Sequence, residues 1–286
     1  MSAGSKAVLI TGCSTGIGRE TARHLAGLGG FTVYATARKP ETLAELEAAG
    51  CKTLALDVND EASMKAAVDA VEAAEGYVWG LVNNAGYSQS GAVESVPLES
   101  LRRQFETNVF GLVRMCQLVL PGMRRNGGGR IVNLSSMGGK LVFPGGGAYH
   151  ATKYAVEALS DAMRFEVKGF GVDVVLIEPG LITTNFGDTA AGSVDDAGAD
   201  EGDDPYAKFN AGVAKATAEV YEGPMAKLGG GPDAVAKKIE KALTTSRPKP
   251  RYTVTASAKL AMGQRRLVTD RMWDRLMTSQ FTRPGR

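Results

Sequence analysis

The chain has 286 residues, and its 44% hydrophobic content is enough to build a sizeable core. Lysine and arginine number 33 against 31 acidic residues, and this balance indicates neither a nucleic-acid-binding nor a membrane-binding protein. No stretch approaches the ~20 apolar residues of a membrane span, and the N-terminal residues lack signal-peptide features. We therefore expect a cytoplasmic protein. Its three scattered cysteines are expected to be free thiols, and no metal site is predicted.

Short apolar runs alternate with helical patterns along most of the chain. The predicted strands cover residues 7–11, 31–36, 53–56, 81–83, 131–134 and 172–177. The first predicted helix follows the strand at 7–11 and ends at Leu28. The other predicted helices cover residues 41–49, 60–74, 98–125 and 149–168. Continuously apolar strands that alternate with helices form parallel βαβ units buried on both faces. The sequence thus predicts a single α/β domain over residues 1–286, a doubly wound (Rossmann) parallel sheet that binds ligands at the carboxyl ends of its strands.

Residues 187–230 differ in composition, with six acidic residues among glycine and alanine at positions 195, 196, 200, 201, 203 and 204. Few apolar anchors are present, so we expect a mobile, solvated loop. Long loops in compact domains are often functional, and a substrate lid is a compatible interpretation.

The chain then continues with a predicted helix at 232–243, a strand at 252–255 and a C-terminal extension at 256–286. Residues 259–281 are amphipathic, with apolar positions at Leu260, Leu267, Met272, Trp273, Leu276 and Met277. We expect the extension to pack on the domain or on a partner subunit. A helix lying on a membrane surface is the alternative that the same pattern allows.

A glycine-rich turn follows the first strand and opens the first helix. Glycine lets backbone N–H groups approach a pyrophosphate, and a helix N-terminus carries partial positive charge. Hydroxyl side chains in the turn add hydrogen-bond donors. We therefore predict a dinucleotide site here, rather than a purely structural turn, at Gly12, Ser14, Thr15, Gly16, Ile17 and Gly18.

The end of the second strand indicates which dinucleotide is bound. An acidic residue at this point would hold the ribose 2′-hydroxyl of NAD. This sequence has Arg38 and Lys39 instead, and a guanidinium pairs well with a 2′-phosphate. The prediction is NADP(H), with NAD(H) less favoured. The alternative is a solvated basic pair before Pro40.

Tyr149 and Lys153 are four residues apart on one predicted helix and so share a face. An ammonium beside a phenol favours the phenolate and lowers the pKa of the tyrosine. Ser136 follows a buried strand and supplies a hydroxyl that can polarise a carbonyl. The neighbouring His150 points about 100° away around the helix, so we assign it no catalytic role.

Taken together, these motifs resemble the short-chain dehydrogenase/reductase family in type and in order. The chain has Thr-Gly-x-x-x-Gly-x-Gly at 11–18, Asn-Asn-Ala-Gly at 83–86, Asn108, the Ser136–Tyr149–Lys153 set and Pro-Gly at 179–180. The longer C-terminal tail is similar to the branch that includes 17β-hydroxysteroid and retinol dehydrogenases.

The resemblance implies roles for these positions. Tyr149 is the general acid or base, Lys153 lowers its pKa and binds the nicotinamide ribose, Ser136 orients the substrate, and Asn108 belongs to a proton relay. Further cofactor contacts are implied for Asp57, Val58, Asn84, Ala85, Gly86, Pro179, Gly180, Ile182 and Thr184.

The expected activity is therefore the NADP(H)-dependent interconversion of a carbonyl and an alcohol. Apolar residues at Phe143, Leu181 and Phe186 favour a lipophilic substrate that resembles a steroid, a retinoid or a fatty acyl compound. The family resemblance implies a homodimer or homotetramer built through the helices at 98–125 and 149–168. The alternative function is a non-catalytic protein that senses NADP(H), although such a sensor would not need the Ser136–Tyr149–Lys153 set.

Overall fold

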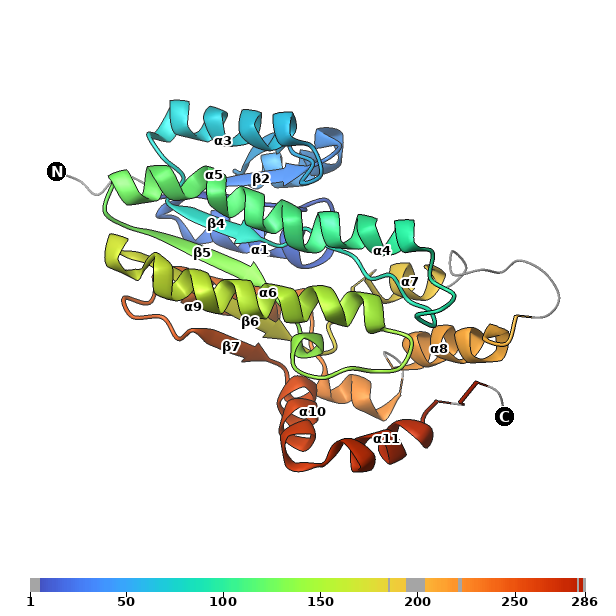
Figure 1. Cartoon of the computed structure of the whole chain (residues 1–286). Coiled ribbons are helices and arrows are strands. Elements are labelled where there is room, and N and C mark those ends of the chain that lie inside the picture. The colour runs from blue at the N-terminus through green and yellow to red at the C-terminus, as the bar shows by residue number, and fades with distance from the viewer. Residues whose placement is uncertain (1–5, 185, 194–203, 221–222, 282, 285–286) are drawn as a thin grey trace.

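The strands of the protein form one parallel sheet, which runs through the middle of the molecule in the computed structural model (Figure 1). The structure describes residues 6–184, 186–193, 204–220, 223–281 and 283–284. Within them the strand order is β3-β2-β1-β4-β5-β6-β7. The bounds are β1 Lys6–Ile10, β2 Phe31–Ala37, β3 Lys52–Ala55, β4 Gly80–Asn83, β5 Gly129–Leu134, β6 Val172–Pro179 and β7 Arg251–Val254. This confirms the predicted doubly wound fold, since the order reverses between β1 and β4.

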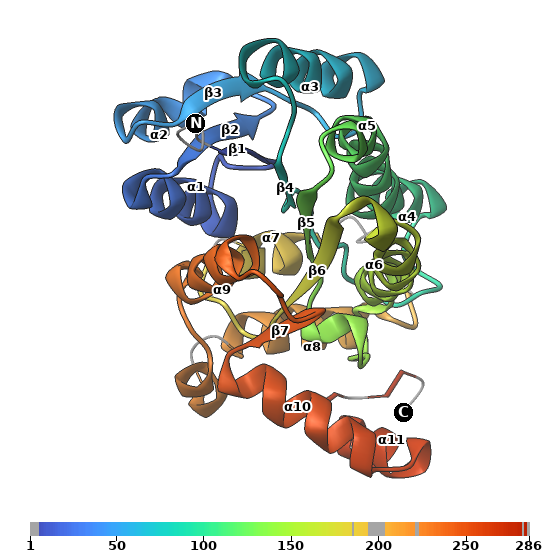
Figure 2. The ribbon, with the colours of Figure 1, turned by 90° about the vertical axis from the view of Figure 1, so that its left-hand side faces the viewer.

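Helices cover both faces of the sheet, as Figure 2 shows from its edge. One face carries α1 (Gly16–Leu28), α2 (Ala44–Ala48) and α9 (Pro232–Thr244). The other carries α3 (Glu61–Glu75), α4 (Leu98–Phe105), α5 (Gly111–Arg125) and α6 (Gly147–Glu166). Connections between parallel strands require such crossover helices, which is why the alternating sequence pattern predicted them.

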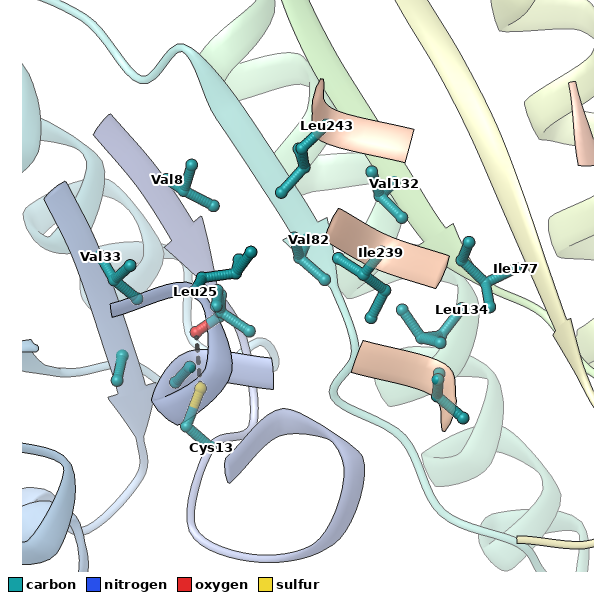
Figure 3. Packing of buried hydrophobic residues seen from close by; sticks show 14 of the residues in the cluster. Val8, Cys13, Leu25, Val33, Val82, Val132, Leu134, Ile177, Ile239 and Leu243 are labelled. Carbon is teal, nitrogen blue, oxygen red and sulfur yellow. Dashed lines mark hydrogen bonds between the residues drawn. The ribbon is translucent and has the colours of Figure 1, made fainter. Parts of the chain in front are cut away.

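The alternation of side chains along each strand divides the core into two layers. Val8 of β1 packs toward α1 and α9, on the same side as Leu25 and Ile239 (Figure 3). Ile10 of the same strand belongs to this cluster. Leu9 of the same strand belongs to the opposite cluster, beneath α3, α5 and α6. Because both faces are buried, the carboxyl edge of the sheet is where the strands can present polar groups to a ligand.

The long helix predicted at 98–125 is not continuous. A π-helical turn at Glu106–Phe110 (η2) separates α4 from α5 and contains the buried Asn108. Turns of this kind accommodate an extra residue and are frequent at functional sites. The hydrophobic spacing alone did not reveal this interruption.

The segment predicted as a mobile loop contains helices in its described parts, so that expectation needs correction. They are α7 (Phe186–Gly192), α8 (Ala207–Glu219) and the short 3₁₀ helix η6 (Pro224–Leu228). Helix α8 is anchored because the Asn210 side chain accepts a hydrogen bond from Ala92 N at 2.9 Å and Val213 packs closely on Gly145. Of the acidic residues, those at 195, 196, 200, 201 and 203 lie outside the described residues.

The C-terminal extension forms α10 (Ala256–Leu267) and α11 (Asp270–Thr278) beyond the β7 edge of the sheet (Figure 2). Trp273 and Met277 pack in a third apolar cluster with Leu141, and Trp273 Nε1 donates to Val142 O at 3.2 Å. This confirms packing on the domain, although Leu260 and Leu267 are exposed. In the described part of the chain, no helix has the length and hydropathy needed to cross a membrane.

Candidate active site

A cleft of about 1140 Å³ lies at the carboxyl ends of the strands. The loops that follow β1 to β6 all contribute to it, as the fold predicts. Most residues predicted to form the site line this cleft. They are Gly12, Ser14, Thr15, Gly16, Ile17, Arg38, Asp57, Val58, Asn84, Ala85, Gly86, Ser136, Tyr149, Lys153, Pro179, Gly180, Ile182 and Thr184. Gly18, Lys39 and Asn108 are not among the lining residues.

The turn after β1 depends on two glycines. Gly12 has φ +72°, and a Cβ there would lie 2.9 Å from Ala85 Cα. A Cβ on Gly18 would lie 2.3 Å from Gly12 O. The absence of a side chain at Gly18 therefore allows α1 to pack closely against the turn. Asn84 Nδ2 donates to both Thr11 O and Gly12 O at 2.9 Å. The turn is therefore held rigidly against the end of β4.

The N-terminus of α1 opens onto the cleft without a side-chain cap. Thr15 occupies the N-cap position but makes no capping hydrogen bond, and the first turn contains no acidic residue. The backbone N–H groups at a helix start lack intrahelical partners and favour an anion. Arg19 stabilises the turn from outside the cleft by donating to Ser14 O and pairing with Glu45 at 3.6 Å.

The cleft ends on one side at the tips of β2 and β3. Arg38 lines it there, whereas the exposed Lys39 precedes the short helix η1 (Pro40–Leu43). Asp57 also lines the cleft, and its Oδ1 accepts a hydrogen bond from Asn59 N at 2.9 Å. This part of the cleft thus contains the guanidinium of Arg38 and the carboxylate of Asp57, which also stabilises the loop after β3 through its bond to Asn59 N.

Tyr149 and Lys153 lie on the first turns of α6, at the other end of the cleft. Lys153 Nζ is 5.6 Å from the centre of the Tyr149 ring and donates to Leu134 O at 2.7 Å. The lysine is buried, with 7% of its surface exposed. Burial lowers the pKa of its ammonium from the ordinary 10.5 to about 8, while the negative charge of Glu157 acts in the opposite direction.

Ser136 caps the short helix η3 (Met137–Gly139) that follows β5. Its Oγ accepts a hydrogen bond from Gly138 N at 3.0 Å, and the residue faces the cleft beside Lys153. Because Leu134 is both the last residue of β5 and the partner of Lys153, the end of this strand brings Ser136 and α6 together.

His150 braces this arrangement. One ring nitrogen, Nδ1, lies 3.0 Å from Gly138 O, and the other, Nε2, accepts a hydrogen bond from Phe143 N at 3.2 Å. These contacts fit a neutral ring with its proton on Nδ1. Burial lowers the pKa of His150, although its bond to Gly138 opposes the shift. The ring also lies 5.7 Å from that of Tyr149 and lines the cleft, which the helical-wheel argument did not predict.

Asn108 lies behind the cleft wall. Its Oδ1 accepts a hydrogen bond from Tyr87 N at 3.1 Å, and its Nδ2 donates to Tyr87 O and to Thr152 Oγ1 at 2.9 and 3.1 Å. The π-helical turn thus connects the segment after β4 to the residue that precedes Lys153.

Several lining residues were not singled out from the sequence. The polar ones include Gln89, Arg103 and Thr107, which carry no motif and are recognisable only once α4 and the segment after β4 are placed. The apolar ones include Met137 and Leu56, together with the expected Phe143, Leu181 and Phe186. The Phe186 ring lies 5.5 Å from that of Tyr149, so the first residue of α7 lies beside the tyrosine.

Comparison with known proteins defines the class. A family model described as short chain dehydrogenase matches residues 6–192, and the chain belongs to this family. An uncharacterized oxidoreductase of Escherichia coli K12, YbbO, is 37% identical over 95% of this chain and 94% of its own length. An NADPH-dependent 3-dehydrocapnine reductase of Ornithobacterium rhinotracheale is 33% identical over 94% of both chains.

Solved structures agree in fold along nearly the whole chain. A short-chain dehydrogenase from Streptomyces avermitilis has a TM-score of 0.77 and 34% identity, over 97% of both chains. A serine dehydrogenase solved in its closed form with NADP+ has a TM-score of 0.74 and 28% identity, over 87% of this chain and 94% of its own. The protein is thus an oxidoreductase of the short-chain dehydrogenase type.

Proposed function

We propose that this protein uses NADP(H) to interconvert a carbonyl compound and its alcohol. The observation that carries the proposal is the buried Lys153 ammonium, placed 5.6 Å from the ring of Tyr149 inside the cleft. An ammonium at this position favours the phenolate and so brings the pKa of the tyrosine nearer to neutral pH. Burying this charge costs stability, and a protein that only bound the cofactor would have no use for the adjacent tyrosine.

The cleft fits a dinucleotide. The uncapped start of α1 and the glycine turn suit a pyrophosphate. A side chain at position 12 would collide with Ala85, so the turn requires glycine there. Arg38 at the far end suits the 2′-phosphate of NADP(H), since no carboxylate replaces it at the end of β2. The NADPH-dependent relative and the NADP+-bound neighbour support this choice of cofactor.

When bound, the nicotinamide supplies or accepts a hydride. Tyr149 then donates its phenolic proton to the carbonyl oxygen in reduction, or removes the hydroxyl proton in oxidation. Lys153 stabilises the phenolate and binds the ribose hydroxyls. Ser136 Oγ accepts from Gly138 N, which directs its own hydroxyl proton away from the turn and toward the substrate oxygen.

Asn108 supports proton transfer by fixing the helix that carries Lys153. Its hydrogen bond to Thr152 Oγ1 holds α6 against the π-helical turn. Its two bonds to the backbone of Tyr87 hold the segment after β4 against the same turn. We place Asn108 in the proposed relay through this contact with the residue next to Lys153.

The apolar lining indicates a lipophilic substrate of the steroid, retinoid or fatty acyl kind. Phe143, Leu181 and Phe186 line the cleft that also contains Tyr149. The ring contact between Phe186 and Tyr149 supports a lid role for the segment that contains α7. Exposed apolar side chains on η2 and α6 are available for assembly of a homodimer or homotetramer, and include Phe110 of η2 and Leu159 and Phe165 of α6.

The test is the loss of NADPH absorbance with a panel of lipophilic ketones and aldehydes, run in parallel with NADH. We expect turnover that is faster with NADPH, with the best panel member identifying the substrate class. Tight NADPH binding without turnover of any carbonyl in the panel would contradict the proposal and favour a cofactor sensor.

A further inference from the structure

A group of buried charges lies directly behind Lys153. Glu157, one turn further along α6, is only 4% exposed. Its Oε2 lies 2.6 Å from Lys140 Nζ at the end of η3 and 3.0 Å from Arg251 Nε of β7. A buried carboxylate is tolerated only with such partners, so Glu157 holds three elements together at this point.

Two further carboxylates approach Arg251 from other sides. Glu178 of β6 is 2% exposed, lies 3.4 Å from Arg251 Nε and accepts a hydrogen bond from Thr253 Oγ1 at 2.8 Å. Burial raises the pKa of Glu178, and the charge of Glu157 contributes to this. Asp161, two turns from Lys153, pairs with Arg251 Nη2 at 2.6 Å from a more exposed position. Glu157 is thus the carboxylate of this group that is nearest to Lys153 along α6.

Close packing connects Glu157 to the turn that carries Ser136. A Cβ on Gly139 would lie 2.9 Å from Glu157 Cγ, 2.8 Å from Ser135 Oγ and 3.0 Å from Lys153 O. Helix η3 therefore rests directly on the α6 turn between Lys153 and Glu157. In addition, the negative charge of Glu157 raises the pKa of Lys153 against the effect of burial.

We propose that Glu157 is a positioning residue for the reaction: its charge keeps the Tyr149–Lys153 pair in the required protonation state, and its ion pair with Lys140 holds the Ser136 turn on α6. This rests on the proposed oxidoreductase function. The charged groups that face Glu157 are Lys140 from the end of η3, Arg251 from β7, Glu178 from β6, and Lys153 and Asp161 from α6 itself. Removing one negative charge from this set makes every neighbouring group release its proton more readily.

Glu157→Gln removes the charge while keeping the shape of the side chain. For alcohol oxidation, in which Tyr149 acts as base, the acidic limb of the kcat/KM profile should move about one pH unit lower. Glu157→Asp keeps the charge and should leave the midpoint in place. Lys140→Gln removes a positive charge and should move the midpoint upward. Asp161→Asn removes the more exposed carboxylate that pairs with the same arginine two turns from Lys153, and it should cause a distinctly smaller shift than Glu157→Gln.

A second readout needs no turnover. The absorbance of tyrosinate is titrated in the protein and in its Tyr149→Phe variant, and the difference reports Tyr149. We expect its midpoint to fall in Glu157→Gln and to rise in Lys140→Gln. If Glu157→Gln slows turnover but changes neither the midpoint of the kcat/KM profile nor the midpoint of the tyrosinate titration, the electrostatic role is overturned. If Glu157→Gln does not fold, the direction of the Lys140→Gln shift decides. If the wild type reduces no carbonyl but the two variants still shift the Tyr149 midpoint as expected, the proposed function is refuted and the electrostatic role of Glu157 is supported.

Discussion

Lys153 shows how a single residue can trade stability for function. Lowering the pKa of its ammonium from 10.5 to about 8 corresponds to a cost on the order of 3 kcal/mol, which is greatest below pH 8 and disappears as the pH rises toward 10.5. Lys153→Met removes this cost but also loses the hydrogen bond to Leu134 O, of about 1 kcal/mol. We expect the variant to be inactive yet about 2 kcal/mol more stable at pH 7 in urea unfolding. A less stable variant at pH 7 would contradict the account of the buried charge.

Because His150 is buried, we expect the protein to lose stability in acid. Burial lowers its pKa in the folded protein, so the unfolded chain binds the proton more readily. The stabilising effect of the neutral ring is therefore complete above its ordinary pKa of 6.5 and is lost as the pH falls through the lower folded value. His150→Gln removes this titration, so its Tm should fall less steeply than that of the wild type below pH 6.5. Equal slopes would show that the ring is not buried as a neutral brace.

Arg38 is expected to determine the choice of cofactor. Loss of a charge-assisted hydrogen bond of about 1.5–3 kcal/mol corresponds to roughly a 10- to 100-fold weaker affinity. Arg38→Gln should raise the Kd for NADPH by this factor and leave the Kd for NADH nearly unchanged, as measured by nucleotide fluorescence. Lys39→Gln is the matched control, since Lys39 does not line the cleft. Equal losses for both nucleotides would remove Arg38 from 2′-phosphate recognition.

At the scale of elements, helix α11 supports the loop between η3 and α6. Trp273 is 8% exposed, donates to Val142 O, and lies 6.1 Å from the Phe143 ring that lines the cleft. Trp273→Ala should destabilise the protein by about 3–5 kcal/mol and raise KM for a lipophilic substrate. The neighbouring Met272 is 49% exposed, and Met272→Ala should stay within about 0.5 kcal/mol of the wild type. Similar effects of both substitutions on the urea midpoint and on KM would show that α11 does not brace this loop.

The sequence predicted those elements whose form depends on local rules. The glycine turn could be recognised because Gly12 and Gly18 are required by backbone geometry within a few residues. The strands could be recognised because burial on both faces leaves continuous apolar runs. The π-helical turn and helices α7 and α8 depend on distant partners, such as Asn210 bonding to Ala92, which no local pattern reveals.

The same distinction applies to the site. Tyr149 and Lys153 were predicted to share a face because they are four residues apart on one helix. Ser136 was added to them through the family resemblance. The brace made by His150 and the charges around Glu157 were not predicted, because they join residues from strands and turns up to 94 positions apart. The helical-wheel argument placed His150 away from Tyr149, whereas the two rings lie 5.7 Å apart and both line the cleft.

At the scale of the whole molecule, each structural layer has a part in the proposed chemistry. The sheet places its loops around one cleft, the glycine turn and Arg38 provide for the dinucleotide, and α6 with η3 provides the proton donor. Phe186 of α7 and Phe143, which α11 supports through Trp273, line the region where a lipophilic carbonyl is proposed to lie. The central claim is that Tyr149 supplies the proton for reduction.

The measurement that tests this claim most directly is a single-turnover reaction with NADPH and the best carbonyl substrate, with NADPH affinity measured separately by fluorescence. Tyr149→Phe should slow reduction by about 10²- to 10⁴-fold while NADPH affinity stays within a few-fold of wild type. Tyr154→Phe, on the same helix but 43% exposed, should react like the wild type. Reduction by Tyr149→Phe at the wild-type rate would contradict the account.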